Sequence, residues 1–372
     1  MNPLLQSFHI RSFRGLKNVS LENLGRINLI VGENNTGKTS VLESLMAFSA
    51  PGVARNWLRV LNARDVGLSD ENIGEVVSWL FPVIGRDRPT EREEILLEGV
   101  SAEKRESLRL KYQLETEIIE QSENKKKSYF EMMQEEQPVR KVAHLFAEWF
   151  SERDGAKSGD LKFGTAGERM GPRFTPVISD SIKRIRTIPM ELVKPQSHRL
   201  GSSAIGALTS AVWAEKKELL VGVLQIFDKD ITGVEMVEGP FEPTLIINHR
   251  NMGPMPLHAF GDGLRKAISV TGLAMRAQNG LLLMDEAEAA LHVHAQDKFF
   301  LGLHELCDDL NVQIFMTTHS LDAVDAILHA SKSRSAEVVA YHLSSENGVR
   351  SVKRYSEEFL GRIRFQRGID IR

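Results

Sequence analysis

The chain has 372 residues, of which 42% are hydrophobic and 26% are charged. This composition is ordinary for a soluble globular protein and argues against a disordered or a membrane-embedded chain. The net charge of -3 gives no general attraction to phosphates, so binding of DNA or RNA would require a local basic patch.

The single cysteine and the first ten residues bear on the cellular compartment of the protein. The single cysteine, Cys307, cannot close an intrachain disulfide, and residues 1–10 lack the basic start and long apolar core of a signal peptide. The longest apolar stretches, such as residues 280–284, are far shorter than the roughly 20 residues that span a bilayer. We therefore expect a cytoplasmic protein with no membrane segment.

Taken in chain order, the apolar pattern predicts two strands within residues 7–31, then a loop at 32–40 that opens a helix to about residue 48. Short helices are predicted over about 53–82. Strict alternation at 106–115 and a second apolar run at 126–133 predict an inserted antiparallel sheet. Glycine and charge predict an exposed loop over 153–175. A helix over 203–227 and strands at 233–237 and 244–250 follow.

The segment GENNTGKTS, residues 32–40, fits the phosphate-loop pattern G-x-x-x-x-G-K-[ST] between a predicted strand and a predicted helix. Glycines let backbone N–H groups wrap phosphates, the lysine neutralises phosphate oxygens, and the threonine hydroxyl can ligate Mg²⁺. The alternative is a glycine-rich turn without a ligand. We expect ATP to be bound by Gly32, Asn34, Asn35, Thr36, Gly37, Lys38, Thr39 and Ser40.

Two adjacent acids, Asp285 and Glu286, follow the apolar strand predicted at 281–284. Unpaired carboxylates at a buried strand end are unfavourable, and a metal ion would compensate them. We expect Asp285 to hold Mg²⁺ together with Thr39, and Glu286 to act as general base on the attacking water. The alternative is two acids that are simply exposed to water.

Two further segments have polar residues where ligands bind in α/β folds. His319 lies at the polar end of the short apolar strand predicted within 311–320, so it can reach a γ-phosphate as a catalytic sensor. Gly261, Asp262 and Gly263 precede a predicted helix. Asp262 can simply cap that helix, but the helix N-terminus can also present free N–H groups to the phosphates of another subunit.

In chain order, the ABC-type ATPases carry a phosphate loop, a signature, a Walker B motif and a switch histidine. These motifs resemble, respectively, residues 32–40, 261–263, 281–286 and 317–320 of this chain. The FRG at 13–15, DEAEAALH at 285–292 and the final GIDIR are similar to the prokaryotic OLD-like (overcoming lysogenisation defect) AAA-type ATPases, relatives of SMC and recombination-repair heads. The resemblance implies an α/β fold, an ABC-type P-loop NTPase head with an inserted helical and antiparallel-β subdomain. It divides the chain into an N-terminal lobe at 1–50, the insertion at 51–218 and a C-terminal lobe at 219–372.

The resemblance also implies a homodimer or higher oligomer in which two heads enclose two ATP molecules and the signature of each completes the other's site. The signature serine is absent from FGDG at 260–263, so we expect slow turnover. The glutamine of the family's glutamine loop has no clear position, and neither Gln113 nor Gln196 has a convincing context. Residues 320–372 are too few for the Toprim nuclease domain of many OLD-like proteins, so a nuclease or toxin effector would be a separate partner.

The leading functional hypothesis is an ATP-driven dimeric switch that senses or controls a partner, as in bacterial anti-phage defence. The alternative is a DNA-clamping head of recombination-repair type, served by the basic excess of residues 350–372, although a solvated terminal face explains that excess equally well. A transporter subunit is disfavoured by the altered signature and the insertion. A small-molecule kinase is disfavoured because no second substrate site is visible.

Overall fold

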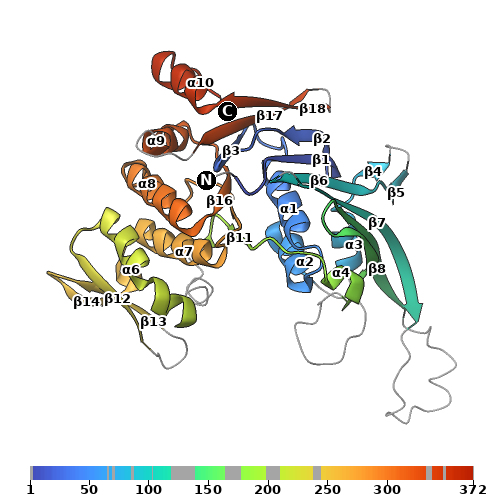
Figure 1. The fold of residues 1–372 in the computed structure, drawn as a ribbon, viewed down its shortest axis with the longest axis horizontal. Coiled ribbons are helices and arrows are strands. Elements are labelled where there is room, and N and C mark those ends of the chain that lie inside the picture. The colour runs from blue at the N-terminus through green and yellow to red at the C-terminus, as the bar shows by residue number, and fades with distance from the viewer. Residues whose placement is uncertain are drawn as a thin grey trace, which may run out of the picture.

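The computed structural model describes residues 3–64, 67–68, 72–84, 88–102, 104–118, 139–163, 177–197, 210–237, 244–331, 337–346 and 349–371. Two large β-sheets form its framework (Figure 1). One is mostly parallel and the other is antiparallel. No helix within these described ranges is long and apolar enough to cross a membrane.

The parallel sheet has six strands in the order β11-β15-β16-β3-β17-β18. Only β18 runs antiparallel to its neighbour. Buried parallel strands lack a polar face, and the three central ones are buried at every position. The strands are β3 Ile27–Val31, β11 Met190–Val193, β15 Leu281–Met284, β16 Gln313–Thr317, β17 Val338–Glu346 and β18 Val349–Ser356.

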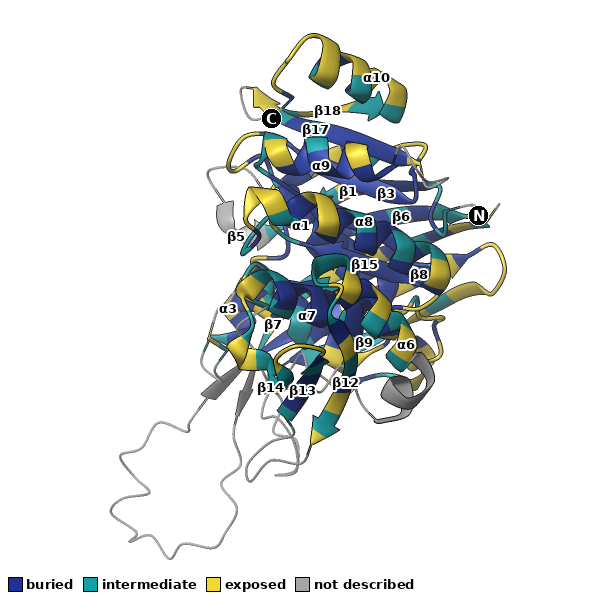
Figure 2. Cartoon of the chain, turned by 90° about the vertical axis from the view of Figure 1, so that its left-hand side faces the viewer, coloured by how far each residue is buried: buried dark blue, intermediate teal, exposed yellow. Residues whose placement is uncertain are grey.

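Alternate residues of the parallel strands pack into two separate cores. In β15, Leu281 and Leu283 face a core that contains α1, whereas Leu282 and Met284 face a core built from α7, α8 and α9. Figure 1 shows these three helices on one side of the sheet and α1 on the other, and Figure 2 shows exposed positions on α9 and α10. The helices are α1 Lys38–Ser49, α7 Asp262–Arg276, α8 Val293–Leu310, α9 Leu321–Ser331 and α10 Glu357–Gly361.

The second sheet has seven antiparallel strands in the order β10-β9-β8-β7-β6-β1-β2. It packs against α1, where the Phe8 and Phe48 rings lie 5.3 Å apart. The short helices predicted over 53–82 are confirmed as α2 Ala54–Leu61 and α3 Ile73–Ser78. The strands are β1 Ser7–Phe13, β2 Leu16–Leu21, β6 Ile95–Ser101, β7 Lys104–Ile118, β8 Val139–Ser151, β9 Gly155–Phe163 and β10 Val177–Ile178.

Two sequence predictions are wrong here, and a third falls on residues that the structure does not describe. Residues 7–31 form three strands rather than two, because the chain leaves the antiparallel sheet after β2 and enters the parallel sheet as β3. The loop predicted over 153–175 contains strand β9, which pairs with β8 along its whole length. The strand predicted at 126–133 lies outside the described residues, and β8 takes its expected place beside β7.

Residues 51–218, predicted as an inserted subdomain, extend sheets that the flanking segments begin. Strand β6 pairs with β1, and β11 pairs with β15 at the edge of the parallel sheet. A three-stranded sheet lies beside α6 Ser210–Phe227 at the far end of Figure 1. It comprises β12 Ile231–Val237, β13 Thr244–His249 and β14 Gly253–Pro256, and residues 203–209 of the predicted helix lie outside the described ranges.

Candidate functional site

The carboxyl ends of β3, β11, β15 and β16 meet at one edge of the parallel sheet. The parallel register pairs Met284 with Met316 and Thr317 with Ile30, so the loops that follow these strands must be neighbours. Ligands of open α/β sheets bind outside this edge. Three of the four predicted motifs therefore follow strand ends where a site is expected, whereas the signature lies at the start of α7.

The loop that follows β3 has a backbone that requires glycine at two positions. Gly32 has φ 142° and Gly37 has φ 105°, both in the region that favours glycine. A Cβ at Gly32 would lie 2.2 Å from the carbonyl oxygen of Leu343, and one at Gly37 would lie 2.6 Å from Leu16 Cδ2. The two glycines of the motif are thus required by the loop conformation and by its close neighbours.

Lys38, the first residue of α1, is buried and points back into the loop. Its Nζ donates to the carbonyl oxygens of Gly32 and Glu33 at 2.7 and 2.8 Å. Burial lowers the pKa of Lys38, and nearby Asp285 partly opposes that shift. The N-cap of α1, Gly37, supplies no side-chain acceptor, so the helix N-terminus retains free N–H donors for an anion.

Asp285, directly after β15, joins the loop to β16. Its carboxylate accepts from the Thr39 hydroxyl at 3.1 Å and from the Thr317 hydroxyl at 2.6 Å. The Thr317 hydroxyl in turn accepts from the backbone N–H of Glu286 at 2.9 Å. Hydroxyl and carboxylate oxygens are ligands that suit Mg²⁺, so Thr39 and Asp285 could hold that ion between them.

The structure separates the two predicted catalytic residues. His319 lines the same cleft as Lys38 and Asp285, and its backbone N–H donates to Glu288 Oε1 at 2.9 Å. Glu286 is exposed, has φ 49°, and is not among the residues that line this cleft. Within one chain, therefore, the histidine faces the candidate site and the glutamate lies at its margin.

The cleft has a volume of about 1060 Å³ and includes Asn34, Asn35, Thr39 and Ser40 of the loop. Among the described residues that line the cleft, Asp285 is the one acidic residue. Seven lining residues are basic: Arg14, Lys17, Lys38, Arg64, Arg92, Lys194 and Arg350. Arg14 and Arg64 pair with buried Glu43, and Lys17 pairs with Glu93, so the excess is smaller than this count but is still positive. Positive charge in a concave site favours a polyanionic ligand.

Sequence reasoning missed part of this lining. Arg64 donates to the Ser40 hydroxyl at 2.8 Å and to buried Glu43, with no motif to indicate it. Lys194 and Gln196 reach the cleft because they follow β11, the strand beside β15. Gln196, which has no convincing context in the sequence, thus lies at the sheet edge that holds the cleft.

The basic residues of the C-terminal segment are dispersed. Arg350 lines the cleft and donates from Nε to the Thr36 carbonyl oxygen at 2.9 Å. Arg354 contacts the Asn23 carbonyl oxygen and Glu337, whereas Arg364 pairs with Asp325. These three arginines therefore contribute to internal contacts rather than to one shared surface.

The predicted signature lies apart from the cleft of its own chain. Gly261 is the N-cap of α7 and Asp262 is its first residue, so the expected capping role of Asp262 is wrong. Instead, Asp262 accepts from the Arg265 side chain at 3.0 Å. Neither these two residues nor Gly263 line the cleft, and Gly261 and Asp262 are exposed.

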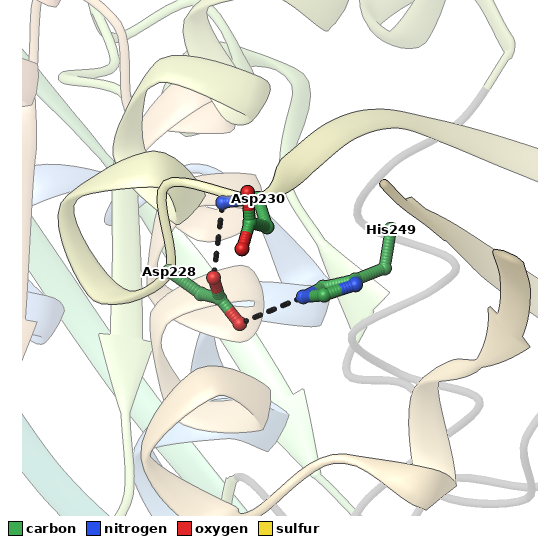
Figure 3. A group of neighbouring side chains, drawn as sticks. All are labelled: Asp228, Asp230 and His249. Atoms are coloured by element: carbon green, nitrogen blue, oxygen red, sulfur yellow. Dashed lines mark hydrogen bonds and ion pairs between the residues drawn. The ribbon is translucent and has the colours of Figure 1, made fainter. Parts of the chain in front are cut away.

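A second group with potential metal ligands lies beside the three-stranded sheet: Asp228, Asp230 and His249 (Figure 3). His249 Nδ1 accepts the backbone N–H groups of Asn251 and Met252, both at 3.2 Å. This assigns the imidazole proton to Nε2, which lies 3.2 Å from Asp228 Oδ2 and donates to it. The nitrogen that faces Asp228 is thus a donor, and the three residues belong to a hydrogen-bonded turn.

The fold and the cleft define the class of protein: a P-loop ATPase with a head of the ABC/SMC type. The chain belongs to the family described as "AAA domain, putative AbiEii toxin, Type IV TA system", whose profile matches residues 27–325.

The chain is also similar to individual proteins of this class. An ATP/GTP phosphatase of Helicobacter pylori is 23% identical over 344 residues, which cover 87% of each chain. The oligopeptide transport ATP-binding protein OppD of Haemophilus influenzae is 30% identical over 137 residues, which cover 34% of this chain and 42% of OppD. A solved SMC head, bound to the C-winged helix domain of ScpA, covers 96% of this chain with 12% identity and a TM-score of 0.51, which confirms the predicted fold class.

Proposed function

We propose that this protein is an ATP-binding and ATP-hydrolysing switch that works as a dimer of heads and controls a separate effector. The observation that carries this proposal is the contact of the Thr39 hydroxyl with the Asp285 carboxylate at 3.1 Å. It brings a phosphate-loop hydroxyl and a strand-end carboxylate together, as a metal–triphosphate site requires. The basic cleft around this contact supplies the charge that a triphosphate needs.

In this proposal the loop binds the triphosphate through its backbone N–H groups and Lys38. Lys38 Nζ now donates to two loop carbonyl oxygens, so it is already held at the loop and can exchange those acceptors for phosphate oxygens. Thr39 and Asp285 would hold Mg²⁺, which neutralises charge on the phosphates when bound. Gln196, at the end of β11, is our candidate for the glutamine loop.

Hydrolysis requires a base for water and a donor for the γ-phosphate, roles that we assign to Glu286 and His319. His319 lies in the cleft, and the loop that carries Glu286 is tied to Thr317 and hence to Asp285. Glu286 itself is exposed beside the cleft, which suits a base whose site is completed when a second head closes. The exposed Gly261 and Asp262, together with Gly263, would then contact the partner's phosphates.

The effector is proposed to be a nuclease or toxin, and the setting to be bacterial anti-phage defence. Two features bear on this setting. The family description links the matched domain itself to a putative toxin of a type IV toxin–antitoxin system, which supports a toxin–antitoxin setting rather than the separateness of the effector. The sequence also resembles OLD-like ATPases, and its signature lacks the serine that fast transporter subunits carry.

The test measures Mg²⁺-dependent ATP hydrolysis by the wild type, Thr39→Ala and Asp285→Asn, and the molecular mass of Glu286→Gln by light scattering with and without ATP. Hydrolysis that stops in both cleft variants, with ATP-dependent dimers of Glu286→Gln, would support the switch. Full hydrolysis by Asp285→Asn, or by a monomer under dilution, would contradict it. Duplex binding that needs ATP and weakens steeply with salt would instead favour a DNA clamp.

A further inference from the structure

The cleft has two chemically different ends. Thr39, Asp285 and Lys194 also share a small adjoining cavity, so they lie together at the end where metal and terminal phosphates are proposed. The other lining group comes from the β1–β2 turn and from residues 79–83. The backbone N–H of Arg14 donates to the Leu80 carbonyl oxygen at 2.8 Å, which fixes these two segments to each other.

The β1–β2 turn in turn contacts the phosphate loop. Leu16 lies against Gly37, and the Arg350 guanidinium lies against Gly15 while its Nε holds the Thr36 carbonyl oxygen. The segment 79–83 is therefore connected to the loop through a chain of direct contacts. A ligand whose phosphates occupy the loop can therefore reach this lining with the rest of its body.

Trp79 is the unusual residue of that segment. Its side chain is 44% exposed, whereas Trp57 and Trp149 are 0% and 4% exposed. Trp57 donates from its indole Nε1 to the Pro51 carbonyl oxygen, but the Trp79 indole has no hydrogen-bond partner among the described residues. Val83, 45% exposed, lines the same part of the cleft. A tryptophan so exposed inside a basic cleft is not explained by core packing.

We propose that Trp79 is the platform on which the nucleobase stacks, with Val83 extending its apolar surface. A purine offers a flat π-face, and stacking on an aromatic side chain is favourable for every base. Stacking carries no hydrogen-bond readout, so Trp79 accepts adenine and guanine alike. This inference rests on the proposed function, because it takes the triphosphate to lie on the phosphate loop.

The experiment compares ATP, GTP and inorganic tripolyphosphate, which has no base, as ligands in calorimetric titrations with Mg²⁺. The variants are Trp79→Ala, Trp79→Phe and the control Phe150→Ala, an exposed aromatic on β8 outside the cleft. We expect Trp79→Ala to weaken both nucleotides by about 5- to 100-fold, from the usual strength of base–aromatic stacking, and to leave tripolyphosphate binding unchanged. Trp79→Phe should retain most of the nucleotide affinity, and Phe150→Ala all of it.

The other outcomes separate failure of the Trp79 platform from failure of the proposed function. Unchanged nucleotide affinity in Trp79→Ala would refute the platform and leave the phosphate loop intact. An equal loss for tripolyphosphate would mean that Trp79 only supports the loop, which also refutes it. Failure of the wild type to bind either nucleotide or tripolyphosphate would refute the proposed function itself. If Trp79→Ala does not fold, quenching of wild-type tryptophan fluorescence by ATP and its loss in Trp79→Phe decide the question.

Discussion

Arg350 of β18 donates from Nε to the carbonyl oxygen of Thr36 at 2.9 Å, across 314 positions of sequence. The bond attaches the phosphate loop to the edge strand of the parallel sheet. Removing it in Arg350→Ala should weaken ATP binding about three- to tenfold, because one such hydrogen bond contributes about 0.5–1.5 kcal/mol. Calorimetric titration measures this, with exposed Lys353→Ala on the same strand as the control. Equal affinities for both variants and the wild type would show that the loop needs no such support.

Lys38→Ala should abolish ATP binding, since the loop then lacks the buried charge that compensates the phosphates. Calorimetry tests the binding, and circular dichroism checks that the head still folds. Undiminished affinity in the folded variant would overturn the phosphate-loop assignment.

Glu286→Gln should bind ATP normally and hydrolyse it at least about tenfold more slowly, because the amide keeps the shape of the side chain but cannot accept the proton; general bases contribute about 10² to 10⁴ in rate. The backbone bond from Glu286 to Thr317 is unaffected by the substitution. Exposed Glu358→Gln in α10 is the control. Turnover equal to the wild type would assign the base to another residue.

The strands that precede the phosphate loop, Asp285 and His319 were predictable, because each is a short apolar run followed at once by polar residues. Other features depend on contacts between distant segments. The Gly-rich stretch at β9 suggested a loop, yet a Cβ at Gly159 would lie 1.9 Å from the Ser179 hydroxyl, so this glycine permits close packing inside a strand. Arg64 and Arg350 reach the cleft through tertiary contacts that no local pattern records.

Lys266 of α7 is buried, and its Nζ donates to the carbonyl oxygens of Ala287 and Ala289 in the loop after Glu286. Burial lowers the pKa of Lys266 from 10.5 to about 8. Between pH 8 and 10.5 the unfolded chain therefore holds this proton more tightly than the folded chain, and stability from this group rises with pH across that window. Below pH 8 the group contributes no slope.

Lys266→Met should remove this pH-dependent contribution to the stability of the fold. The stability of the wild type relative to the variant should then increase by up to about 3 kcal/mol between pH 7 and 10, since one pKa unit corresponds to about 1.4 kcal/mol. Melting temperatures of both proteins are compared at each pH across this range. The other titrating groups contribute equally to both proteins and drop out of the difference. A difference that stays constant with pH would show that Lys266 keeps an ordinary pKa.

The last prediction concerns the shared site. Gly263 lies in the first turn of α7, and a Cβ there would meet only Ala295 and Leu291 at 4.0 Å, so a larger side chain can be added without a clash at its base. If the signature meets a partner's phosphates, Gly263→Arg obstructs that approach. Each head of this variant should still bind ATP through residues 32–40, but hydrolysis should stop.

The decisive experiment mixes Gly263→Arg with Lys38→Ala, each inactive alone. In a mixed dimer, one site combines the intact loop of the Gly263→Arg subunit with the intact signature of the Lys38→Ala subunit. Random pairing of equal amounts makes about half of the dimers mixed, so about a quarter of wild-type activity should return. No recovery, despite subunit exchange shown by fluorescence transfer, would mean that the signature does not act across the dimer or that both sites must hydrolyse together. Single-turnover hydrolysis by a wild-type dimer loaded at one site would separate these two explanations, because it can proceed only if one site acts alone.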